Sequence, residues 1–456
     1  MIDIKWLRSE PDLFIHAAKS KRIGVDIPAI LEMDRKLLAA QQEQQAIRTE
    51  QNKAGKEIAE ANRTLKEDVE KYNDAKQVGA DADVVTSLAQ VVAEQRQRVV
   101  NLQQKPSQLK VRAKELQDEL DGLKPQFDQL LMLVPQPADP EVPEGKDDTE
   151  NVELRRVGEV RKFDFEPKDH MELGLALDII DVDRGVKLAG SRNYFLKGAG
   201  AMLHQAILRL AVDQMVAKGY ILMTPPVLVR EEVMYGTGYF PVGRDQAYLC
   251  ERDGLSLVGT AEVPVTAYHS EEILAQAELP KKYVALSTCF RREAGAAGKD
   301  TYGLYRIHLF DKVEQVIIAP NDKAQSIALH QEILKNAEDV LAALELPYRV
   351  VNVCTGDLGQ GQVQKFDIET WMPSRKSYGE THSASRFYEF QARRLNLRYR
   401  DAEGSVRYCH TLNNTVIASP RVLIPVLELY QNADGTVTVP KALRQYMGGM
   451  EVIRAR

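Results

Sequence analysis

The spacing of apolar residues separates an N-terminal rod from a C-terminal globule. In the second half of the rod, apolar side chains follow steps of three and four over about six heptads: Leu88, Val92, Val99, Leu102, Leu109, Ala113, Leu116, Leu120, Leu123, Phe127, Leu130 and Val134. Such steps keep one stripe of a helix apolar, which is typical of a coiled coil. A weaker seam precedes it, through Ile47, Gln51, Ala54, Ile58, Ala61 and Leu65.

The two seams predict an antiparallel helical hairpin. Between them lies the stretch 78–83, in which Gly79 suits a helix C-cap and Asp83 an N-cap. Two helices of about 50 residues would form an arm near 75 Å long. Pro106 and Pro125 fall within the second helix, where we expect kinks or a break. The pattern alone leaves open whether this arm binds a partner or serves as a dimerisation or spacer coiled coil.

The rod ends at a stretch rich in Pro and Asp, which predicts a linker over residues 135–150. Beyond it, strands are predicted at 220–229, 283–290, 310–318, 348–353 and 366–372, and helices at 200–219 and from Leu423. Strands without regular alternation with helices favour an α+β fold, in which helices flank a mainly antiparallel sheet. No glycine-rich phosphate loop follows a strand, so neither a P-loop nor a Rossmann site is predicted.

Composition and charge exclude several classes of protein. The 456 residues are 44% hydrophobic and 28% charged, with a net charge of −6, which argues against a protein that coats nucleic acid. Four scattered cysteines (Cys250, Cys289, Cys354 and Cys409) form no metal-binding pair, so no zinc site is expected, and they fit a reducing cytosol. The sequence shows neither a signal peptide nor an apolar run long enough to cross a membrane, so we expect a cytoplasmic protein.

The strongest chemical signal lies between residues 289 and 314. A predicted strand ends in Arg291-Arg292-Glu293, a loop of small residues follows, and a second strand returns with Phe310 and Glu314. An Arg fork can bind two phosphate oxygens, a carboxylate can accept from an amine, and an aromatic ring can stack on a base. A hairpin with a solvated charged face is the simpler alternative, which the clustering of several Arg and Glu makes less favourable.

Three further stretches carry candidate site residues. Asn413 and Thr415 precede Arg421, which enters an otherwise apolar helix and would need a ligand or partner there. Glu262 and Glu380 each stand beside hydroxyl residues, a combination that suits ammonium, hydroxyl or Mg²⁺ recognition. Alone, the stretches around Glu262 and Glu380 are weak signals, because most such stretches are capped turns. The simpler alternative for Arg421 is a surface position at a helix N-terminus, which the helix dipole disfavours.

At these residues the sequence resembles the seryl-tRNA synthetases, a family of class II aminoacyl-tRNA synthetases. The resemblance covers nearly the whole chain. It includes the Met-Ile-Asp-Ile start, the hairpin arm and the motifs at 235–239, 260–264, 290–295, 354–359, 390–394 and 439–449. It implies a tRNA-binding domain over residues 1–134 with a coiled-coil arm, and a class II catalytic domain over residues 135–456.

The resemblance also implies a reaction. The carboxylate of serine attacks the α-phosphorus of ATP, giving seryl-adenylate and pyrophosphate, and the 3′-terminal ribose of the tRNA then takes the seryl group. Neither step needs a covalent enzyme nucleophile, so catalysis would rest on positioning and charge stabilisation. Expected partners are L-serine, the serine tRNA gripped by the arm (and the selenocysteine tRNA where present), and a second subunit, with Pro226 in the dimer-forming motif.

Matching positions imply roles for individual side chains. Serine would lie among Thr260, Glu262, Arg291, Glu314, Asn413 and Thr415, with Glu262 facing its ammonium group. ATP would contact Arg291 at its α-phosphate, Glu293 at the adenine amine, Arg306 at the γ-phosphate, and Phe310 and Arg421 on the two faces of adenine. Glu380 and Ser383 would carry Mg²⁺. Arg291, Glu293 and Arg421 would be the principal catalytic residues.

The chain departs from the common family pattern around the serine pocket. Asn413-Asn414-Thr415 replaces the usual Asn-Gly-Ser, so motif 3 is a variant, and Thr381-His382-Ser383 follows Glu380 in place of Ile-Ser-Ser. Two alternatives therefore stay open at this point: a related enzyme that activates another small amino acid, and a non-catalytic paralogue that binds RNA.

Overall fold

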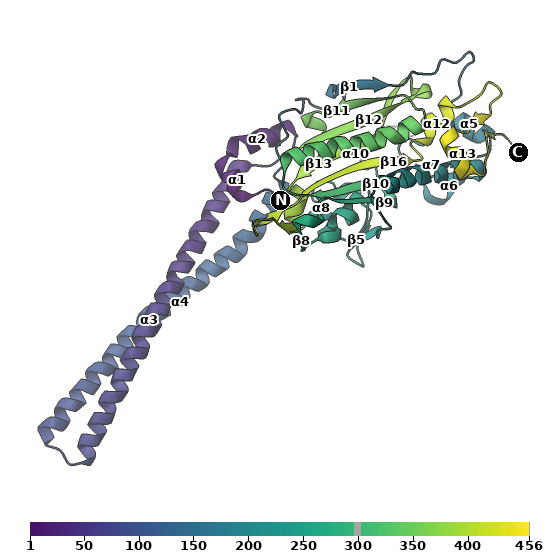
Figure 1. Ribbon diagram of the computed structural model, residues 1–456. Helices are drawn as coiled ribbons and strands as arrows, with labels where there is room; N and C mark the ends of the chain where they lie inside the picture. Colours follow the sequence, from purple (N-terminus) through teal and green to yellow (C-terminus); the bar gives the residue numbers. More distant parts are fainter. Residues whose placement is uncertain (296–301, 456) are drawn as a thin grey trace. The chain divides into compact units, whose positions relative to one another are not determined.

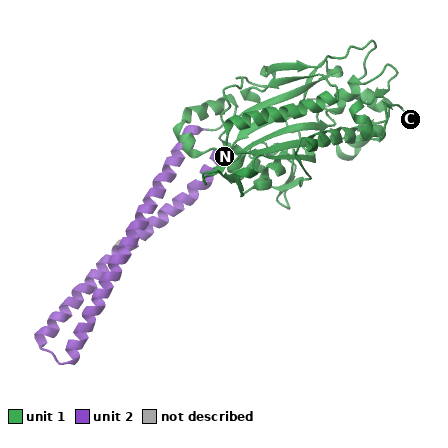
Figure 2. Cartoon of the chain, viewed as in Figure 1, with its two compact units in different colours: residues 1–25, 132–456 green, residues 26–131 purple. Residues whose placement is uncertain are grey.

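The protein forms two compact units. The computed structural model describes residues 1–295 and 302–455, apart from the side chain of Lys105, so part of the predicted small-residue loop (296–301) lies outside the described residues. One unit comprises residues 26–131, and the other comprises residues 1–25 together with 132–456 (Figure 2). No helix in the described part of the chain has the length and apolar character needed to cross a bilayer.

The first unit is the predicted helical hairpin. Its helices are α3 (Ile27–Gln77) and α4 (Ala82–Leu133), and the seam residues Ile47, Ala61, Val92 and Leu116 are buried. Gly79 has φ +71°, as expected after a helix end. The side chain of Asp81, rather than the predicted Asp83, accepts a hydrogen bond at the start of α4.

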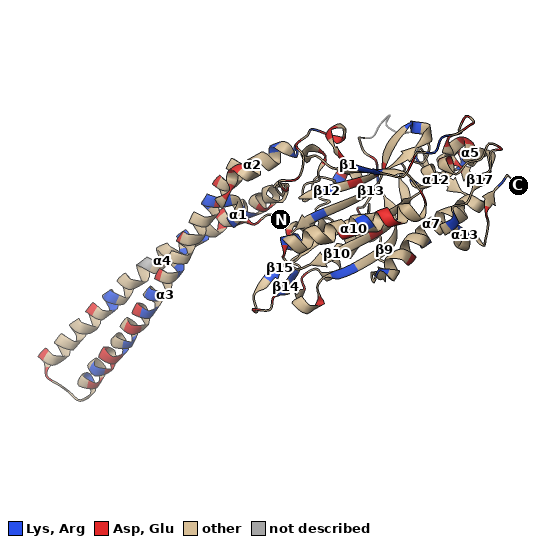
Figure 3. Ribbon diagram, turned by 45° about the horizontal axis from the view of Figure 1, so that its top comes forward, with Lys and Arg blue, Asp and Glu red and all other residues tan. Residues whose placement is uncertain are grey.

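Helix α4 is continuous through Pro106 and Pro125, so neither proline breaks it. Each proline removes one backbone donor, and packing along a helix of 52 residues outweighs that local loss. Basic and acidic residues are interspersed along both helices (Figure 3). The bidentate Arg112–Glu43 pair joins α4 to α3.

Residues 1–25 pack with the globule. They form α1 (Ile4–Ser9) and α2 (Pro11–Ser20). The terminal ammonium donates to the Phe390 carbonyl at 2.6 Å, and the buried Lys21 ammonium donates to backbone carbonyls of residues 359–362. The Pro-rich stretch after α4 is likewise ordered, since the amides of Gln136 and Asp139 donate to the carbonyls of Gln360 and Val363.

The globule is built on an eight-stranded sheet with the order β1-β11-β12-β13-β16-β10-β9-β4 (Figure 1). Its strands are β1 (Val152–Val157), β4 (Ile221–Met223), β9 (Lys281–Phe290), β10 (Leu309–Ala319), β11 (Tyr348–Asn352), β12 (Gln364–Met372), β13 (Ser377–Tyr388) and β16 (His410–Ser419). Every pairing is antiparallel except that of β4 with β9, which confirms the predicted mainly antiparallel sheet.

Smaller elements surround this sheet. The other strands are β2 (Ile180–Asp181), β3 (Phe195–Leu196), β5 (Leu228–Arg230), β6 (Leu249–Cys250), β7 (Leu255–Leu257), β8 (Ile273–Ala275), β14 (Arg398–Arg400), β15 (Val406–Tyr408), β17 (Val437–Thr438) and β18 (Val452–Ile453). The helices are α5 (His170–Ala176), α6 (Val182–Ala189), α7 (Gly198–Ala217), α8 (Glu231–Thr237), α9 (Glu262–Thr266), α10 (Lys323–Ala343), α11 (Phe390–Arg394), α12 (Leu423–Leu429) and α13 (Lys441–Arg444).

The two faces of the large sheet have different environments. Helices α7 and α10 lie along one face (Figure 1), and the main core forms there around residues such as Val313, Ile317, Ile368 and Leu412. Side chains alternate between faces along a strand, so the neighbouring polar residues of these strands point to the opposite face. That opposite face carries the candidate site.

Candidate active site

Strand pairing gathers the predicted residues on one face of the sheet. In β10, Phe310, Lys312 and Glu314 alternate onto the same face, opposite Cys289, Ser287 and Ala285 of β9. Arg291 follows β9 in the same alternation, and its amide donates to the His308 carbonyl. Thr415 and Asn413 of β16 join this face because they lie opposite Glu314 and Val316.

Three adjacent cavities open over this face. A cavity of about 460 Å³ is lined by Arg291, Glu293 and Arg306 together with Tyr239 and Gly259. A smaller one of about 50 Å³ shares Arg291 and Glu293 with it and adds Phe310, Lys312, Glu380, Thr415 and Arg421. A third, of about 280 Å³, is lined by Glu262, Tyr239 and residues 359–362. Most of the candidate residues predicted from the sequence therefore line one continuous region.

One end of the region concentrates buried charge. The Lys312 ammonium lies 2.5 Å from Glu314 Oε2, and the Thr415 hydroxyl lies 3.4 Å from the same carboxylate oxygen. Burial raises the pKa of Glu314, and Lys312 opposes that rise. An amine-binding site needs such a carboxylate held in place without being fully neutralised.

Glu262 supplies a second carboxylate at this end. Its backbone amide donates to the Thr260 hydroxyl at 3.1 Å, and its Oε1 accepts from the Gln391 amide at 2.8 Å. Partial burial and then the nearby Glu314 raise the pKa of Glu262 from 4.5 to about 7. A cationic ligand placed between the two carboxylates would offset the burial of Glu262 and its repulsion by Glu314, and would thereby lower the pKa of Glu262.

The other end presents guanidinium groups and aromatic rings. The Arg291 guanidinium lies 5.2 Å from the centre of the Phe310 ring, and Arg306 Nη1 donates to Glu293 Oε2 at 2.9 Å. Arg421 lies over Tyr305 at 4.5 Å, so this ring, as well as Phe310, faces a cation. Three guanidinium groups around two adjoining cavities form a natural binding place for a polyphosphate, and the rings suit a base.

A β-bulge brings Glu380 and Ser383 onto the same face. Glu380 lies opposite Glu369 and Ser383 opposite Asp367, because β13 carries one extra residue between them. Partial burial alone would raise the pKa of Glu380, but Arg421 and Lys365 outweigh that effect and lower it. The Arg421 guanidinium approaches Glu380 Oε2 at 3.7 Å.

The residues around this bulge have the chemistry that Mg²⁺ prefers. Asp367, across the ladder from Ser383, keeps a buried carboxylate oxygen without a hydrogen-bond partner among the described residues. No group of three or more His, Cys, Asp or Glu in residues 1–295 and 302–455 is arranged to hold a metal on its own. A carboxylate, a hydroxyl and a free buried oxygen suit Mg²⁺, which takes few protein ligands and completes its shell with waters and substrate phosphates.

Sequence reasoning missed several residues of the site. Lys312 could have been found from the alternation of Phe310, Lys312 and Glu314 along one strand. Gln391 lies in the family motif at 390–394, but nothing in the sequence gave it or Tyr305 a role, because each reaches the site through a contact between segments far apart in the sequence. Gln391 accepts a hydrogen bond from Thr411, and the Tyr305 carbonyl accepts from Arg421 at 3.1 Å.

Models of two protein families match the chain. Residues 248–430 match the class II tRNA synthetase core domain (G, H, P, S and T), and residues 1–102 match the seryl-tRNA synthetase N-terminal domain. Together the two matches include helix α3, the first part of α4 and the strands that carry most of the candidate residues.

Curated proteins and solved structures agree with these matches. A serine–tRNA ligase of Deinococcus radiodurans is 42% identical, with 99% of each chain covered. A serine–tRNA ligase of Rubrobacter xylanophilus is 46% identical over 73% of this chain and 78% of its own. The crystal structure of the Pyrococcus horikoshii seryl-tRNA synthetase complexed with ATP superposes with a TM-score of 0.86 at 34% identity, covering 100% of both chains.

Proposed function

Because the chain belongs to the seryl-tRNA synthetases, the serine–tRNA ligases of class II, we propose that the region between Glu262 and Arg421 binds serine and ATP and joins them into seryl-adenylate. The enzyme is an aminoacyl-tRNA ligase, and its catalytic unit has the class II fold. Side chains of the catalytic unit would perform the reaction by binding and orienting the two substrates.

The observation that carries the proposal is the arrangement of charge at the two ends of one region. Glu314 is close enough to Glu262 to raise its proton affinity, and the Arg291 guanidinium lines the adjoining cavities. An amino acid carries an ammonium group and a carboxylate on the same carbon, so this arrangement complements it. Thr415, Asn413 and Thr260, which are all buried, would surround the hydroxyl of serine.

In the first step, a serine carboxylate oxygen bonds to the α-phosphorus of ATP, and the bond from that phosphorus to the β-phosphate bridging oxygen breaks. Pyrophosphate leaves with the electron pair. Arg291 would bridge the serine carboxylate and the α-phosphate, so that the two reacting groups share one cation. Arg306 would bind the γ-phosphate, which requires it to turn from Glu293 when ATP enters.

Adenine would lie against Phe310, with Arg421 on its other face and Glu293 at its amino group. The neighbouring Tyr305 ring helps to hold the Arg421 guanidinium in place, since the guanidinium lies 4.5 Å from the ring centre. Glu380 and Ser383 would hold Mg²⁺, which neutralises charge on the phosphates when bound. In the second step a ribose hydroxyl of the tRNA attacks the carbonyl carbon of the adenylate, and the bond from that carbon to the phosphate oxygen breaks. AMP leaves with the electron pair, and the hydroxyl proton passes to its phosphate.

The remaining assignments follow the same family. The arm would grip the serine tRNA, and the selenocysteine tRNA where one exists, and its intermixed charges leave room for a local basic path along the RNA. A second subunit would cover the apolar side chains exposed around the edge strand β4 and Pro226: Met202, Val216, Ile221, Leu222 and Leu228. We expect the enzyme to work in the cytoplasm.

Amino-acid-dependent exchange of pyrophosphate into ATP tests the assignment directly. We expect exchange with serine and much weaker exchange with threonine, alanine, glycine and cysteine. Exchange with another amino acid in preference to serine would contradict the proposed specificity.

Arg291→Ala tests the role of the shared cation. We expect the exchange rate to fall by at least about a hundredfold, because the charge acts on the transition state, with no change in the melting temperature. Arg292→Ala is the matched control: Arg292 is exposed, and its guanidinium donates to the Asp245 carbonyl. Equal activity in the two variants would refute the role given to Arg291.

A further inference from the structure

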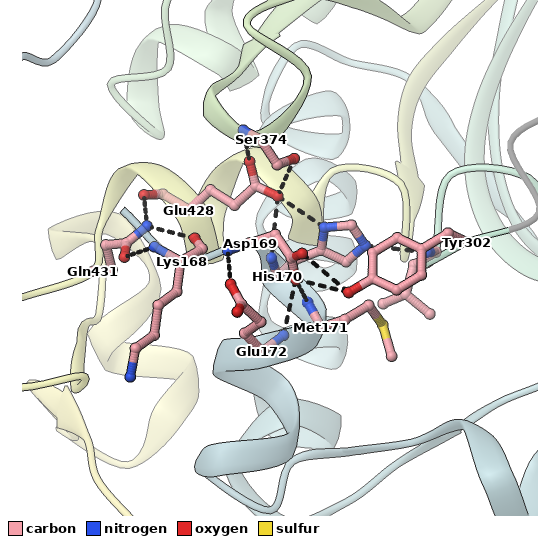
Figure 4. Close-up of polar contacts among 10 residues, drawn as sticks. Lys168, Asp169, His170, Met171, Glu172, Tyr302, Ser374, Glu428 and Gln431 are labelled. Atoms are coloured by element: carbon pink, nitrogen blue, oxygen red, sulfur yellow. Dashed lines mark hydrogen bonds and ion pairs between the residues drawn. The ribbon is translucent and has the colours of Figure 1, made fainter. Parts of the chain in front are cut away.

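His170 joins three segments of the chain beside the nucleotide cavities. It is the first residue of α5, directly after the cap residue Asp169, and its side chain is only 7% exposed. Figure 4 shows its imidazole between the Glu428 carboxylate of α12 and the Tyr302 ring from the loop between β9 and β10. This histidine lies outside all the sequence motifs that indicate the family.

The contacts of Glu428 fix the tautomer of the imidazole. Glu428 is fully buried, and its two oxygens accept from the His170 backbone amide at 3.1 Å and from the amide and hydroxyl of Ser374 at 2.9 and 2.7 Å. Its Oε1 also lies 2.8 Å from His170 Nδ1. A carboxylate oxygen can only accept here, so Nδ1 carries the ring proton and Nε2 presents a lone pair.

That lone pair receives a backbone hydrogen bond from the loop. The Leu304 amide donates to His170 Nε2 at 3.2 Å, and both residues are buried. Gly303 has φ +76°, and a Cβ on it would stand 2.3 Å from Nε2, so the backbone passes in close contact with this edge of the ring. Tyr302 adds a third contact, since its hydroxyl donates to the Asp169 carboxylate at 3.0 Å.

The two residues that follow Leu304 belong to the proposed ATP site. The Tyr305 carbonyl accepts from Arg421 Nε, and its ring stacks on the same guanidinium. Arg306 pairs with Glu293 on the wall of the cavity of about 460 Å³. A shift of the Leu304 backbone would therefore displace both groups, while Glu428 anchors the imidazole to the helix that begins just after Arg421.

We propose that His170 is a positioning residue for ATP: by accepting the Leu304 amide proton, it holds residues 302–306 where Tyr305 and Arg306 meet the nucleotide. The inference rests on the proposed function, because it uses the assignment of Arg306 and Arg421 to ATP. His170 lies far in sequence from the side chains assigned to the phosphates, and it would act on them only through the backbone of residues 302–306.

A pair of substitutions separates the two contacts of the ring. Asparagine can still donate to Glu428 but is too short to reach Leu304, whereas glutamine is long enough to accept from the Leu304 amide. We expect His170→Asn to weaken ATP binding roughly tenfold, the usual effect of losing one buried hydrogen bond, and His170→Gln to recover most of that loss. Binding is measured by calorimetric titration of the full-length protein with Mg·ATP.

His269→Asn is the matched control. His269 is also buried, with a carboxylate at 2.6 Å (Glu272) and a tyrosine hydroxyl at 2.8 Å (Tyr283), but it lies outside the proposed ATP site. In exchange kinetics we expect His170→Asn to raise the KM for ATP and leave the KM for serine within about twofold. His269→Asn is expected to lower the melting temperature without changing either KM.

Three results would overturn the proposal: unchanged ATP affinity in His170→Asn, an equal loss in His269→Asn, or no recovery in His170→Gln. If His170→Asn does not fold, Tyr302→Phe removes only the exposed contact with Asp169 and is expected to weaken ATP binding about threefold; unchanged binding then counts against the proposal. Titration with ATP needs no serine, so the ATP affinities of the His170 and His269 variants test this proposal alone. Failure of serine-dependent exchange in the wild-type protein would instead contradict the proposed function.

Discussion

The negative charge of Glu262 should favour serine binding and, at the same time, lower the free energy of unfolding. Its pKa is raised from 4.5 to about 7 by partial burial and by Glu314. A carboxyl that binds its proton more tightly when folded loses stability as pH rises from about 4.5 to about 7, and the loss persists above that range. At ~1.4 kcal/mol per pH unit the difference corresponds to ~3 kcal/mol, and solvent access at the cavity reduces this to ~2 kcal/mol.

Glu262→Gln removes the charge and keeps the shape, and its amide oxygen can still accept from Gln391. We expect the variant to be more stable than the wild type by ~2 kcal/mol at pH 8, which is roughly 3 °C in melting temperature for a core of this size. The gain should vanish near pH 5, where the wild-type carboxyl is protonated. Scanning calorimetry at several pH values between 5 and 8 measures it.

The same substitution should damage serine binding. Loss of a charged hydrogen bond to the ammonium group corresponds to a rise of roughly ten- to a hundredfold in the KM for serine. In the wild-type enzyme the KM for serine should fall as pH rises towards about 7, because only the ionised Glu262 attracts the ammonium. Glu251→Gln, in an exposed turn, serves as the control and should change neither quantity. A stability gain that is equal at pH 5 and pH 8 would refute the link between the charge of Glu262 and stability.

Two further predictions concern the partners of these carboxylates. Gln391→Leu removes the amide that donates to Glu262 and should raise the KM for serine roughly tenfold in exchange assays; an equal rise in the KM for ATP would contradict a local role. Lys312→Met leaves Glu314 buried without its cation and should lower the free energy of unfolding by ~3 kcal/mol in urea denaturation, and adding Glu314→Gln should restore most of that loss. No recovery in the double variant would show that Lys312 stabilises the fold in some other way.

Much of the fold was predictable because it depends on local periodicity. The heptad spacing predicted both helices of the arm and the turn at Gly79, and the alternation at 283–290 and 310–318 predicted two neighbouring strands of the large sheet. The continuity of α4 through Pro106 and Pro125 was not predictable from local preference. A proline costs one hydrogen bond and some steric strain, whereas a partner helix stabilises many residues on either side of it.

The candidate site was predictable where one strand carries several of its residues, as with Phe310 and Glu314, and where a family motif marks a position. Contacts between distant segments left no trace in the sequence. Gln391 reaches Glu262 across 129 positions, and the Leu304 amide reaches His170 across 134. Such residues have ordinary neighbours along the chain, so neither periodicity nor composition distinguishes them.

Two β-bulges beside the site, in β13 and β16, explain why simple alternation would have misassigned its residues. Glu380 and Ser383 are three positions apart, which in a regular strand would place them on opposite faces. The extra residue in β13 restores them to one face, beside Asp367. A second bulge, in β16 opposite Val313 and Glu314, directs Thr415 to the site and Ile417 to the core. Each bulge changes which face the following residues occupy, so the polar site and the apolar core can share the same strands without burying an unpaired charge beneath the helices.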